Sequence, residues 1–382
     1  SVPWVAPQDI RGDIDTLIGM EDIKKEVKQV VDFFKNRSEY AKHGIEKNMN
    51  VMFSGPAGTG KSKLAGYFAK ELGYPIITAE GSSLETGYVG GGSRALKSIY
   101  KRALKLKNCV VFIDEAQSLF MKRGAHSIND SKYADDTPNT FLSILDGVST
   151  KKEGNIIWVV ASNFDDSSME MDEAMLRRFQ LKINFRLPNK EERKSILKKY
   201  FQSSADLGDS EKQPSLTPPS DELIAEMSEY TAELSPAILE TIAKKAKVMA
   251  ISEKTTLTRE VLFKSFEQTV IGMSNRENTI ELHKTRKTVA EHELGHFFVQ
   301  LHFALEDNNQ DVEKAFDAMN LLKISTESIS KVGALGYVLS KQQDDKLFSR
   351  QALERDIMKL YGGVAAEEVL HGQQGISTGS SD

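Results

Sequence analysis

Three side chains that bind metals or move protons lie together in the segment AEHELGHFF, residues 290–298: His292, Glu293 and His296. Because residues i and i+4 lie on one face of a helix, the two imidazoles can bind one metal ion. Glu293 lies about 100° around the helix, which suits a general base that holds a metal-bound water. The spacing therefore predicts a zinc hydrolase site, with two surface histidines or a metal-free relic as the alternatives.

The residues that follow decide how far this helix continues. His302 lies six residues after His296, as in a three-histidine zinc pattern that needs glycine at position 299. This chain has Val299, which is β-branched and disfavours the positive φ of such a turn. A continuing helix carries His302 some 240° away from His296, so we exclude it as a ligand. We expect a buried helix, because its apolar residues recur at a helical period: Ala290, Leu294, Phe297, Phe298 and Leu301.

A glycine-rich loop, GPAGTGKS, stands between the apolar run NVMFS and the helical pattern KLAGYFAKEL. This order of strand, loop and helix is typical of a phosphate-binding loop. The glycines let backbone N–H groups turn toward phosphate oxygens, and the helix N-terminus adds a favourable dipole. We expect Lys61 to reach the β- and γ-phosphates of ATP and Ser62 to hold Mg²⁺. The predicted nucleotide-binding residues of the loop are Gly55, Pro56, Ala57, Gly58, Thr59, Gly60, Lys61, Ser62 and Lys63.

An acidic pair, Asp114 and Glu115, ends the apolar run CVVFI, residues 109–113. Such a pair alone is weak evidence, because strands often end in surface carboxylates. Downstream of a phosphate loop it predicts that Asp114 is a Mg²⁺ partner. Glu115 is then positioned to polarise the water that attacks ATP.

The pattern of apolar runs predicts an α/β fold with a parallel sheet. Five short β-rich runs are separated mostly by helical patterns, which is typical of strands buried on both faces. An amphipathic helix is expected over 20–35 and a polar surface loop over 203–221. Helices alone are expected over 222–271, followed by helix around 283–303, strand over 331–340 and helix over 349–371. The predicted strands are residues 50–54, 75–79, 109–113, 156–161 and 181–187.

Composition limits the classes of function. The chain has 382 residues, a net charge of −5 and a pI near 5.9, which does not favour a dominant role in nucleic-acid binding. Its single cysteine, Cys109, excludes an internal disulfide and fits the cytoplasm or an equivalent reducing compartment. No apolar run reaches the roughly 18 residues needed to span a bilayer. The chain opens on Ser1 and ends in GSSD, which we interpret as a fragment of a longer protein.

Four segments, GPAGTGKS, FIDEA, VVASN and MDEAMLRRF, resemble the AAA+ ATPases in order and spacing. The resemblance implies that Asn163 is the sensor that orients the lytic water. It also implies that Arg177 or Arg178 reaches into a neighbouring subunit's nucleotide as an arginine finger. A cation added in this way stabilises charge on the transferred phosphoryl group.

Two further segments resemble the same family. TLIG, residues 16–19, resembles the adenine-pocket stretch, which implies contacts to the base from Leu17, Ile18 and Gly19. TGYVGGG, residues 86–92, resembles the pore loop, in which Tyr88 and Val89 would grip an unfolded protein chain. Aromatic contacts to a varied polymer give purchase with little sequence specificity.

Over roughly residues 14–382 the chain resembles the FtsH family of membrane-anchored AAA+ zinc proteases. The resemblance implies a linker over 1–15, a large nucleotide-binding domain over 16–200 and a small helical lid over 201–275. A mainly helical HExxH zinc-protease domain over 276–382 follows, incomplete at its C-terminus. LRRF lacks the usual spacer between the two arginines, which leaves the identity of the finger open. Residues 303–322 are longer than the family's connection and lie near the cleft.

A catalytic zinc needs a third protein ligand besides His292 and His296. In the FtsH family an aspartate supplies it, in a stretch that resembles the terminal STGSSD. Aligned without a gap, that ligand is residue 383; aligned with one gap, it is Asp382. Glu367 and Glu368 are further candidates, or groups that support the ligands.

The resemblance implies an ATP-dependent zinc metalloprotease that unfolds proteins and threads them through a homo- or hetero-hexameric ring. Its cofactors would be ATP, Mg²⁺ and Zn²⁺, and its membrane anchor would lie outside this chain. One alternative is a non-proteolytic remodelling ATPase with a degenerate zinc site. Another is a scaffold subunit of a mixed ring, competent in neither reaction.

Overall fold

The computed structural model of the chain describes residues 2–46, 48–84, 91–120, 137–150, 155–163, 172–202, 216–270, 282–319, 321–325, 337–340 and 349–372. The chain divides into two compact units. The first holds residues 1–188 and 235–237, and the second holds residues 189–234 and 238–382. The finer division into linker, nucleotide-binding domain, lid and protease domain stays a prediction.

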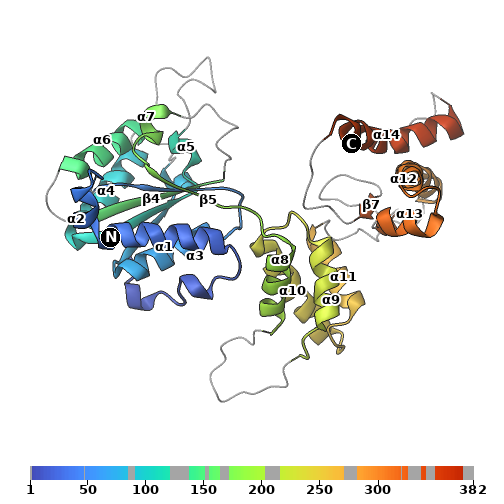
Figure 1. Cartoon of the computed structure of the whole chain (residues 1–382), viewed down its shortest axis with the longest axis horizontal. Helices are drawn as coiled ribbons and strands as arrows, with labels where there is room; N and C mark the ends of the chain where they lie inside the picture. The colour runs from blue at the N-terminus through green and yellow to red at the C-terminus, as the bar shows by residue number, and fades with distance from the viewer. Residues whose placement is uncertain are drawn as a thin grey trace. The chain divides into compact units, whose positions relative to one another are not determined.

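A five-stranded parallel sheet forms the centre of the first unit (Figure 1). Its strand order is β2-β3-β4-β1-β5, which confirms the predicted α/β fold. Each predicted run overlaps one strand, although β2, β3 and β4 extend one residue beyond one or both ends of their runs and the run over 181–187 ends three residues beyond β5. The strands are β1 (Val51–Ser54), β2 (Ile76–Glu80), β3 (Asn108–Asp114), β4 (Asn155–Ser162) and β5 (Leu181–Asn184).

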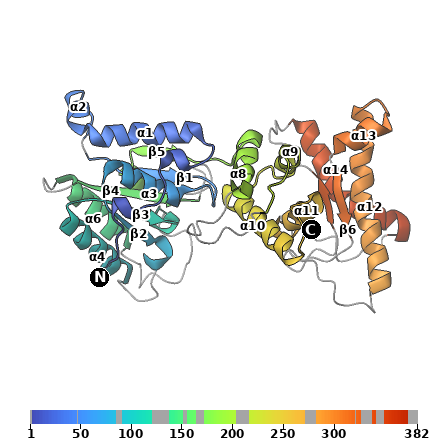
Figure 2. The same ribbon diagram turned by 90° about the horizontal axis from the view of Figure 1, so that it is seen from below.

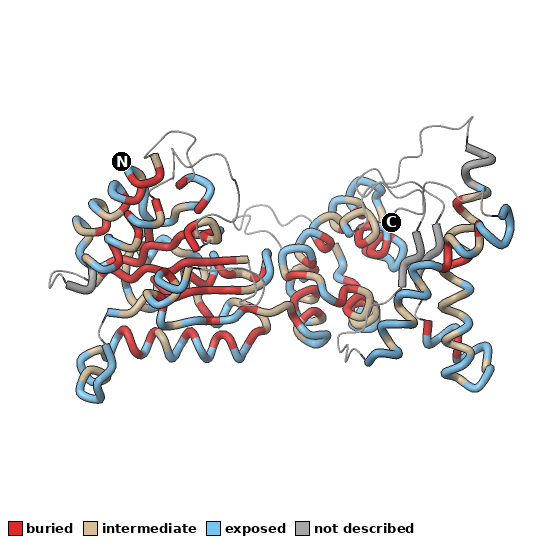
Figure 3. Tube along the Cα trace, turned by 90° about the horizontal axis from the view of Figure 1, so that it is seen from above, coloured by how far each residue is buried: buried red, intermediate tan, exposed pale blue. Residues whose placement is uncertain are grey.

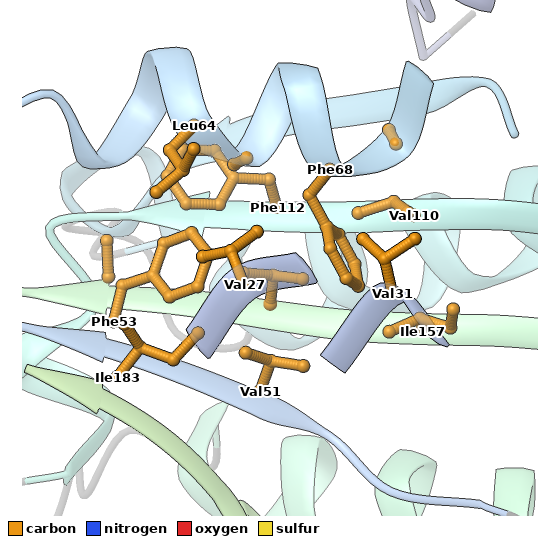
Figure 4. Packing of buried hydrophobic residues seen from close by; sticks show 14 of the residues in the cluster. Val27, Val31, Val51, Phe53, Leu64, Phe68, Val110, Phe112, Ile157 and Ile183 are labelled. Carbon is orange, nitrogen blue, oxygen red and sulfur yellow. The ribbon is translucent and has the colours of Figure 1, made fainter. Parts of the chain in front are cut away.

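Helices cover both faces of this sheet, so its central strands are buried throughout (Figures 2 and 3). Because side chains alternate along a strand, Val51 and Phe53 point to one face and Met52 to the other. The first face packs against α1 (Glu21–Lys35) and α3 (Lys61–Leu72), with the ring of Phe68 reaching the sheet (Figure 4). The second face packs against α4 (Gly91–Leu106) and α6 (Thr137–Thr150).

The second face carries the one cysteine of the chain. Cys109 is fully buried on β3, and burial raises the pKa of its thiol to about 12. Nearby, the ring of Phe141 from α6 meets Trp158 edge to face at 5.2 Å. We expect Cys109 to be a packing residue without thiolate chemistry, because its thiol stays protonated at neutral pH.

The stretch expected to be a linker pairs with the edge of the sheet. Val5 and Ile76 exchange backbone hydrogen bonds of 2.9 Å in an isolated antiparallel bridge. Lys70 donates to the carbonyls of Ile10 and Gly12, at 2.8 and 2.7 Å. The short elements of the first unit are η1 (Pro7–Asp9), η2 (Ile14–Thr16), α2 (Arg37–Lys42), η3 (Gly81–Leu84), α5 (Gln117–Phe120) and α7 (Glu173–Leu176).

The second unit is mostly helical, as predicted, with one small antiparallel sheet. One strand of that sheet, β6 (Leu321–Ser325), was not predicted and pairs with β7 (Tyr337–Ser340). The other elements after β5 are α8 (Lys190–Gln202), α9 (Asp221–Tyr230), α10 (Pro236–Ser252), α11 (Arg259–Val270), α12 (Leu282–Asp307), α13 (Val312–Met319) and α14 (Arg350–His371).

Helices α12 and α14 pack against each other at glycines (Figure 2). A Cβ on Gly295 would lie 2.2 Å from the carbonyl oxygen of Gly362, so the two backbones approach too closely for any side chain there. The prediction that the apolar residues of α12 are buried holds only in part. Leu294 and Phe298 are 40% and 59% exposed, whereas Ala290, Phe297 and Leu301 are half-buried. The buried residues of α12 include Val289, Glu293 and Gly295, and Gly295 lies at the crossing with α14.

Gly295→Ala should destabilise the α12–α14 pair, because the new methyl group meets backbone that has no room to shift. Overpacking of this kind costs about 1–3 kcal/mol. Urea unfolding followed by circular dichroism measures the effect. Gly66→Ala in α3 is the control, because its Cβ would meet nothing closer than Ile10 Cγ2 at 3.7 Å. Equal midpoints for Gly295→Ala and the parent would contradict the close crossing.

Candidate active sites

The phosphate loop has the backbone conformation that its glycines permit. Gly55, Gly58 and Gly60 have φ of 130°, 73° and 97°, which side chains rarely adopt. A Cβ on Gly55 would also lie 2.2 Å from the carbonyl oxygen of Phe185. The loop leads into α3 at Lys61, so the first N–H groups of that helix are directed toward it.

Two side chains of the loop fold back on its own carbonyls. Lys61 Nζ donates to Gly55 and Pro56 at 2.7 and 2.8 Å, and Thr59 Oγ1 donates to Pro56 at 2.8 Å. Lys61 is 5% exposed, and burial lowers the pKa of its ammonium group. A phosphate bound at the loop would give the buried Lys61 ammonium group a negatively charged partner, whereas its present partners are neutral carbonyls.

Because the strands are parallel, Asp114, Glu115 and Asn163 lie at the same end of the sheet as the phosphate loop. Asp114 ends β3 and accepts a hydrogen bond from Ser62 Oγ. Asn163 follows Ser162, which pairs with Ser54 at the end of β1. Glu115 lies beside them, exposed, with φ of 49°. A carboxylate next to a hydroxyl is a donor set that Mg²⁺ accepts, so Ser62 and Asp114 fit the expected ion.

The segment expected to bind the adenine base, residues 16–19, lies beside the phosphate loop. Leu17 Cδ1 is 3.7 Å from the position that a Cβ on Gly60 would occupy. Leu17, Ile18 and Gly19 are each partly exposed, and Gly19 has φ of 74°. The three residues connect η2 to α1, which packs on the same core as α3. Their contact with adenine stays a prediction.

Residues 235–237 belong to the first unit and touch the phosphate loop. Ala237 N donates to Gly58 O at 3.2 Å, and a Cβ on Gly58 would lie 2.7 Å from Ser235 Oγ. Ser235 was not among the residues selected from the sequence. Its hydroxyl is a further polar group near the expected phosphates.

The two candidate arginine-finger residues, Arg177 and Arg178, lie at the opposite end of the strands, near the start of β1. Asn50, directly before β1, donates from Nδ2 to Arg178 O at 2.9 Å. The run from Asn50 to Gly55 spans roughly 16 Å at the rise of a strand, which exceeds the length of an arginine side chain. Arg177 and Arg178 therefore cannot reach a phosphate bound at the loop of their own chain.

The two arginines differ in their partners. Arg178 makes a two-bond pair with Asp146, at 3.1 and 3.2 Å, and its Nη1 donates to Ala174 O at 2.8 Å. The hydrogen bonds to Asp146 raise the pKa of Arg178. Arg177 pairs only with Glu173 among its described contacts, at 3.2 Å, and both side chains are over three-quarters exposed. Both arginines line a cavity of about 210 Å³ at the amino ends of β1, β4 and β5.

The histidine pair on α12 is oriented by α14. His292 Nδ1 donates to Glu367 Oε1 at 2.7 Å, and His296 Nδ1 donates to Lys359 O at 2.7 Å. With Nδ1 as the donor, Nε2 is the nitrogen that each imidazole would use to bind a metal. The rings lie 4.8 Å apart, centroid to centroid. Glu367 is 1% exposed and binds an imidazole, which favours its role as a supporting group.

Gly363 packs closely against the ring of His292. A Cβ on Gly363 would lie 2.2 Å from His292 Nε2, so no side chain fits at position 363 while the ring keeps this position. Glu293, the expected base, is 7% exposed beside it on α12. Within the described residues, no three His, Cys, Asp or Glu side chains gather closely enough to hold a metal ion. Asp382 and the pore-loop pair Tyr88 and Val89 lie outside the described residues.

α12 continues unbroken through Val299, as expected, and carries His302 away from the pair. His302 is mostly exposed and lies 3.4 Å from Glu306. The sequence did not point to Gly363 or Lys359, because the backbone contacts of α14 leave no signature in residue type. Glu367 was identified only as one of two adjacent candidates.

Comparison with known proteins found similarity along most of the chain. Residues 51–187 match the model of the ATPase family associated with various cellular activities. The chain is 30% identical to the ATP-dependent zinc metalloprotease FtsH of Mycoplasma genitalium, over 96% of this chain and 48% of that protein. It is 29% identical to the ATP-dependent zinc metalloprotease FtsH 2 of a Thermoanaerobacter species, over 95% of this chain and 65% of that protein. The chain therefore spans about half the length of the mycoplasma relative.

Glu367→Ala should weaken zinc binding about 10- to 100-fold, because His292 loses the carboxylate that fixes its tautomer. Competition with a chelating dye measures the zinc dissociation constant. Glu368→Ala is the matched control: this neighbour on α14 is exposed, and we expect its affinity to equal that of the parent. An unchanged constant for Glu367→Ala would exclude the supporting role.

Proposed function

We propose that this chain, an FtsH-type AAA+ protein, uses ATP hydrolysis to deliver protein substrates to a zinc peptidase site on the same chain. The first site would bind ATP and Mg²⁺ through the phosphate loop, Ser62 and Asp114. The second would bind Zn²⁺ through His292 and His296. The observation that carries the proposal is that both sites keep their supporting contacts, including the Glu367 carboxylate on His292.

The chain's own residues suggest a division of labour in each site. In the first, Lys61 would bind phosphate oxygens, Glu115 would orient and deprotonate the attacking water, and Asn163 would hold that water in line. In the second, zinc supplies a Lewis acid when bound. Glu293 would accept the proton of the attacking water and pass it to the leaving amine.

The alternative is a remodelling ATPase whose zinc site is degenerate. The buried, hydrogen-bonded Glu367 argues against it, because a buried carboxylate is costly unless it has a function or a partner that requires it. A chain that had lost metal binding would be free to replace Glu367, Gly363 and His292. All three are present and in contact.

Two substitutions separate the two sites. Glu115→Gln should bind ATP at the parent affinity and hydrolyse it very slowly, so casein degradation stops while short peptides are still cut. Glu293→Gln should hydrolyse ATP at the parent rate and cut neither casein nor peptides. Parallel assays of phosphate release and fluorescent casein, with and without a zinc chelator, report both. Chelator-resistant degradation by Glu293→Gln would contradict the proposal.

We infer that the ATPase works as a ring of subunits, with Arg177 as the finger that reaches the neighbouring nucleotide. Arg178 is occupied by Asp146 and Ala174, whereas the exposed pair of Arg177 with Glu173 is worth little and opens readily. A cation supplied in trans also makes hydrolysis depend on assembly. Threading would depend on Tyr88 and Val89, which stay predictions.

Membrane attachment is part of the proposal only through the FtsH resemblance. None of the helices in the described part of the chain has a stretch long and apolar enough to span a bilayer. The FtsH resemblance is the sole ground for expecting an anchor outside these 382 residues.

Arg177→Ala should lower kcat for ATP on the order of 10³-fold, as loss of a finger does, with an unchanged dissociation constant for ADP. Arg178→Ala should instead lower the melting temperature, because Asp146 loses its partner. Steady-state kinetics, nucleotide titration and thermal melts distinguish the two. A parent-like kcat for Arg177→Ala, together with an inactive but stable Arg178→Ala, would reverse the assignment.

A further inference from the structure

The backbone of Glu115 has an uncommon conformation. Its φ of 49° lies in the left-handed region, which a residue with a long side chain rarely adopts. Residues held there need surrounding structure that enforces the conformation, and such positions gather at functional sites. The contacts on either side of Glu115 therefore determine where its carboxylate points.

One side of this peptide is fixed by the sheet. Ala116 N donates to Ala161 O on β4 at 2.8 Å, and Glu115 N donates to Asp114 Oδ1 at 2.9 Å. The chain after β3 is thus tied to the neighbouring strand one residue beyond Glu115. These bonds fix the ends of the peptide and leave the carbonyl of Glu115 pointing away from β4.

The other side is occupied by the backbone of Gly81. The register of β2 and β3 pairs Glu80 with Asp114, so the next residues, Gly81 and Glu115, face each other beyond the strand ends. A Cβ on Gly81 would lie 2.2 Å from Glu115 O, 2.9 Å from its carbonyl carbon and 3.2 Å from Ala116 Cα. Any side chain at position 81 would push the Glu115 peptide toward β4.

We propose that Gly81 is a positioning residue for ATP hydrolysis, which holds the Glu115 peptide between itself and β4 in its left-handed conformation. The inference rests on the proposed role of Glu115 as the water-activating carboxylate. Gly81 touches no substrate. It acts by excluding the backbone rotations that would turn the Glu115 side chain away from the phosphate loop.

Gly81→Ala should lower kcat for ATP while nucleotide binding stays intact. Misplacement of a reacting group by about 1 Å costs on the order of 10²-fold in rate. We expect KM for ATP and the dissociation constant of ADP to stay within about twofold, since the atoms nearest to a Cβ at position 81 belong to Glu115 and Ala116. Expressing kcat per ADP-binding site, from titration, removes any contribution of unfolded protein.

Leu84→Ala is the matched control for damage to η3. Leu84 is the last residue of this short helix and is 1% exposed, so the truncation leaves a cavity at the end away from Gly81. We expect a comparable fall in melting temperature with parent-like kcat per site. If Leu84→Ala lost as much kcat as Gly81→Ala, the effect would be general damage and the proposal would be overturned.

Ala116→Gly tests the same positioning of the Glu115 peptide without introducing a steric clash. It removes the Cβ that stiffens the residue after Glu115 and leaves position 81 unchanged, so it serves even where Gly81→Ala does not fold. We expect a lower kcat per site and an unchanged ADP affinity. Parent-like kcat in either Gly81→Ala or Ala116→Gly, beside a parent that hydrolyses ATP, overturns this inference alone. A parent that does not hydrolyse ATP overturns the proposed function with it.

Discussion

The parallel register of the five-stranded sheet is the constraint on which the nucleotide site depends. Because β1, β3 and β4 run in one direction, the phosphate loop, Asp114 and Asn163 all emerge at one edge. In the same sheet, Arg177 and Arg178 lie in the turn before β5, at the amino ends of the strands. The phosphate loop, Asp114, Glu115 and Asn163 are thereby brought together, and the expected finger is kept away. Under the proposed function, a second copy of the chain would complete the site.

At both sites, a glycine allows the backbone of one element to pack directly against a functional group on another. Gly81 lies against the Glu115 peptide, and Gly363 lies against the His292 imidazole. In each case a missing Cβ lets one element set the position of a functional group on another. The two sites share this device although one is on an α/β sheet and the other on a helix pair. Both are accordingly sensitive to the smallest substitution, glycine to alanine.

Much of the fold was predictable from sequence because the signals were local. The central strands are continuous apolar runs, and the spacing of glycine and lysine predicts the phosphate loop. What failed was decided by tertiary contact. Two residues of the predicted apolar stripe, Leu294 and Phe298, are exposed, because α12 meets α14 at Gly295. The left-handed Glu115 and the pair of His292 with Glu367 depend on register between segments distant in sequence, which no local pattern encodes.

Mixing two inactive variants tests the central claim most directly, since a nucleotide site completed by a second copy can be rebuilt from complementary halves. Glu115→Gln retains Arg177, and Arg177→Ala retains Glu115. We predict that each is nearly inactive alone and that ATP hydrolysis appears when the two are mixed and allowed to exchange subunits. The rate should be highest near equal proportions and should fall on dilution. A mixture whose rate equals the sum of its components at every proportion would contradict the account.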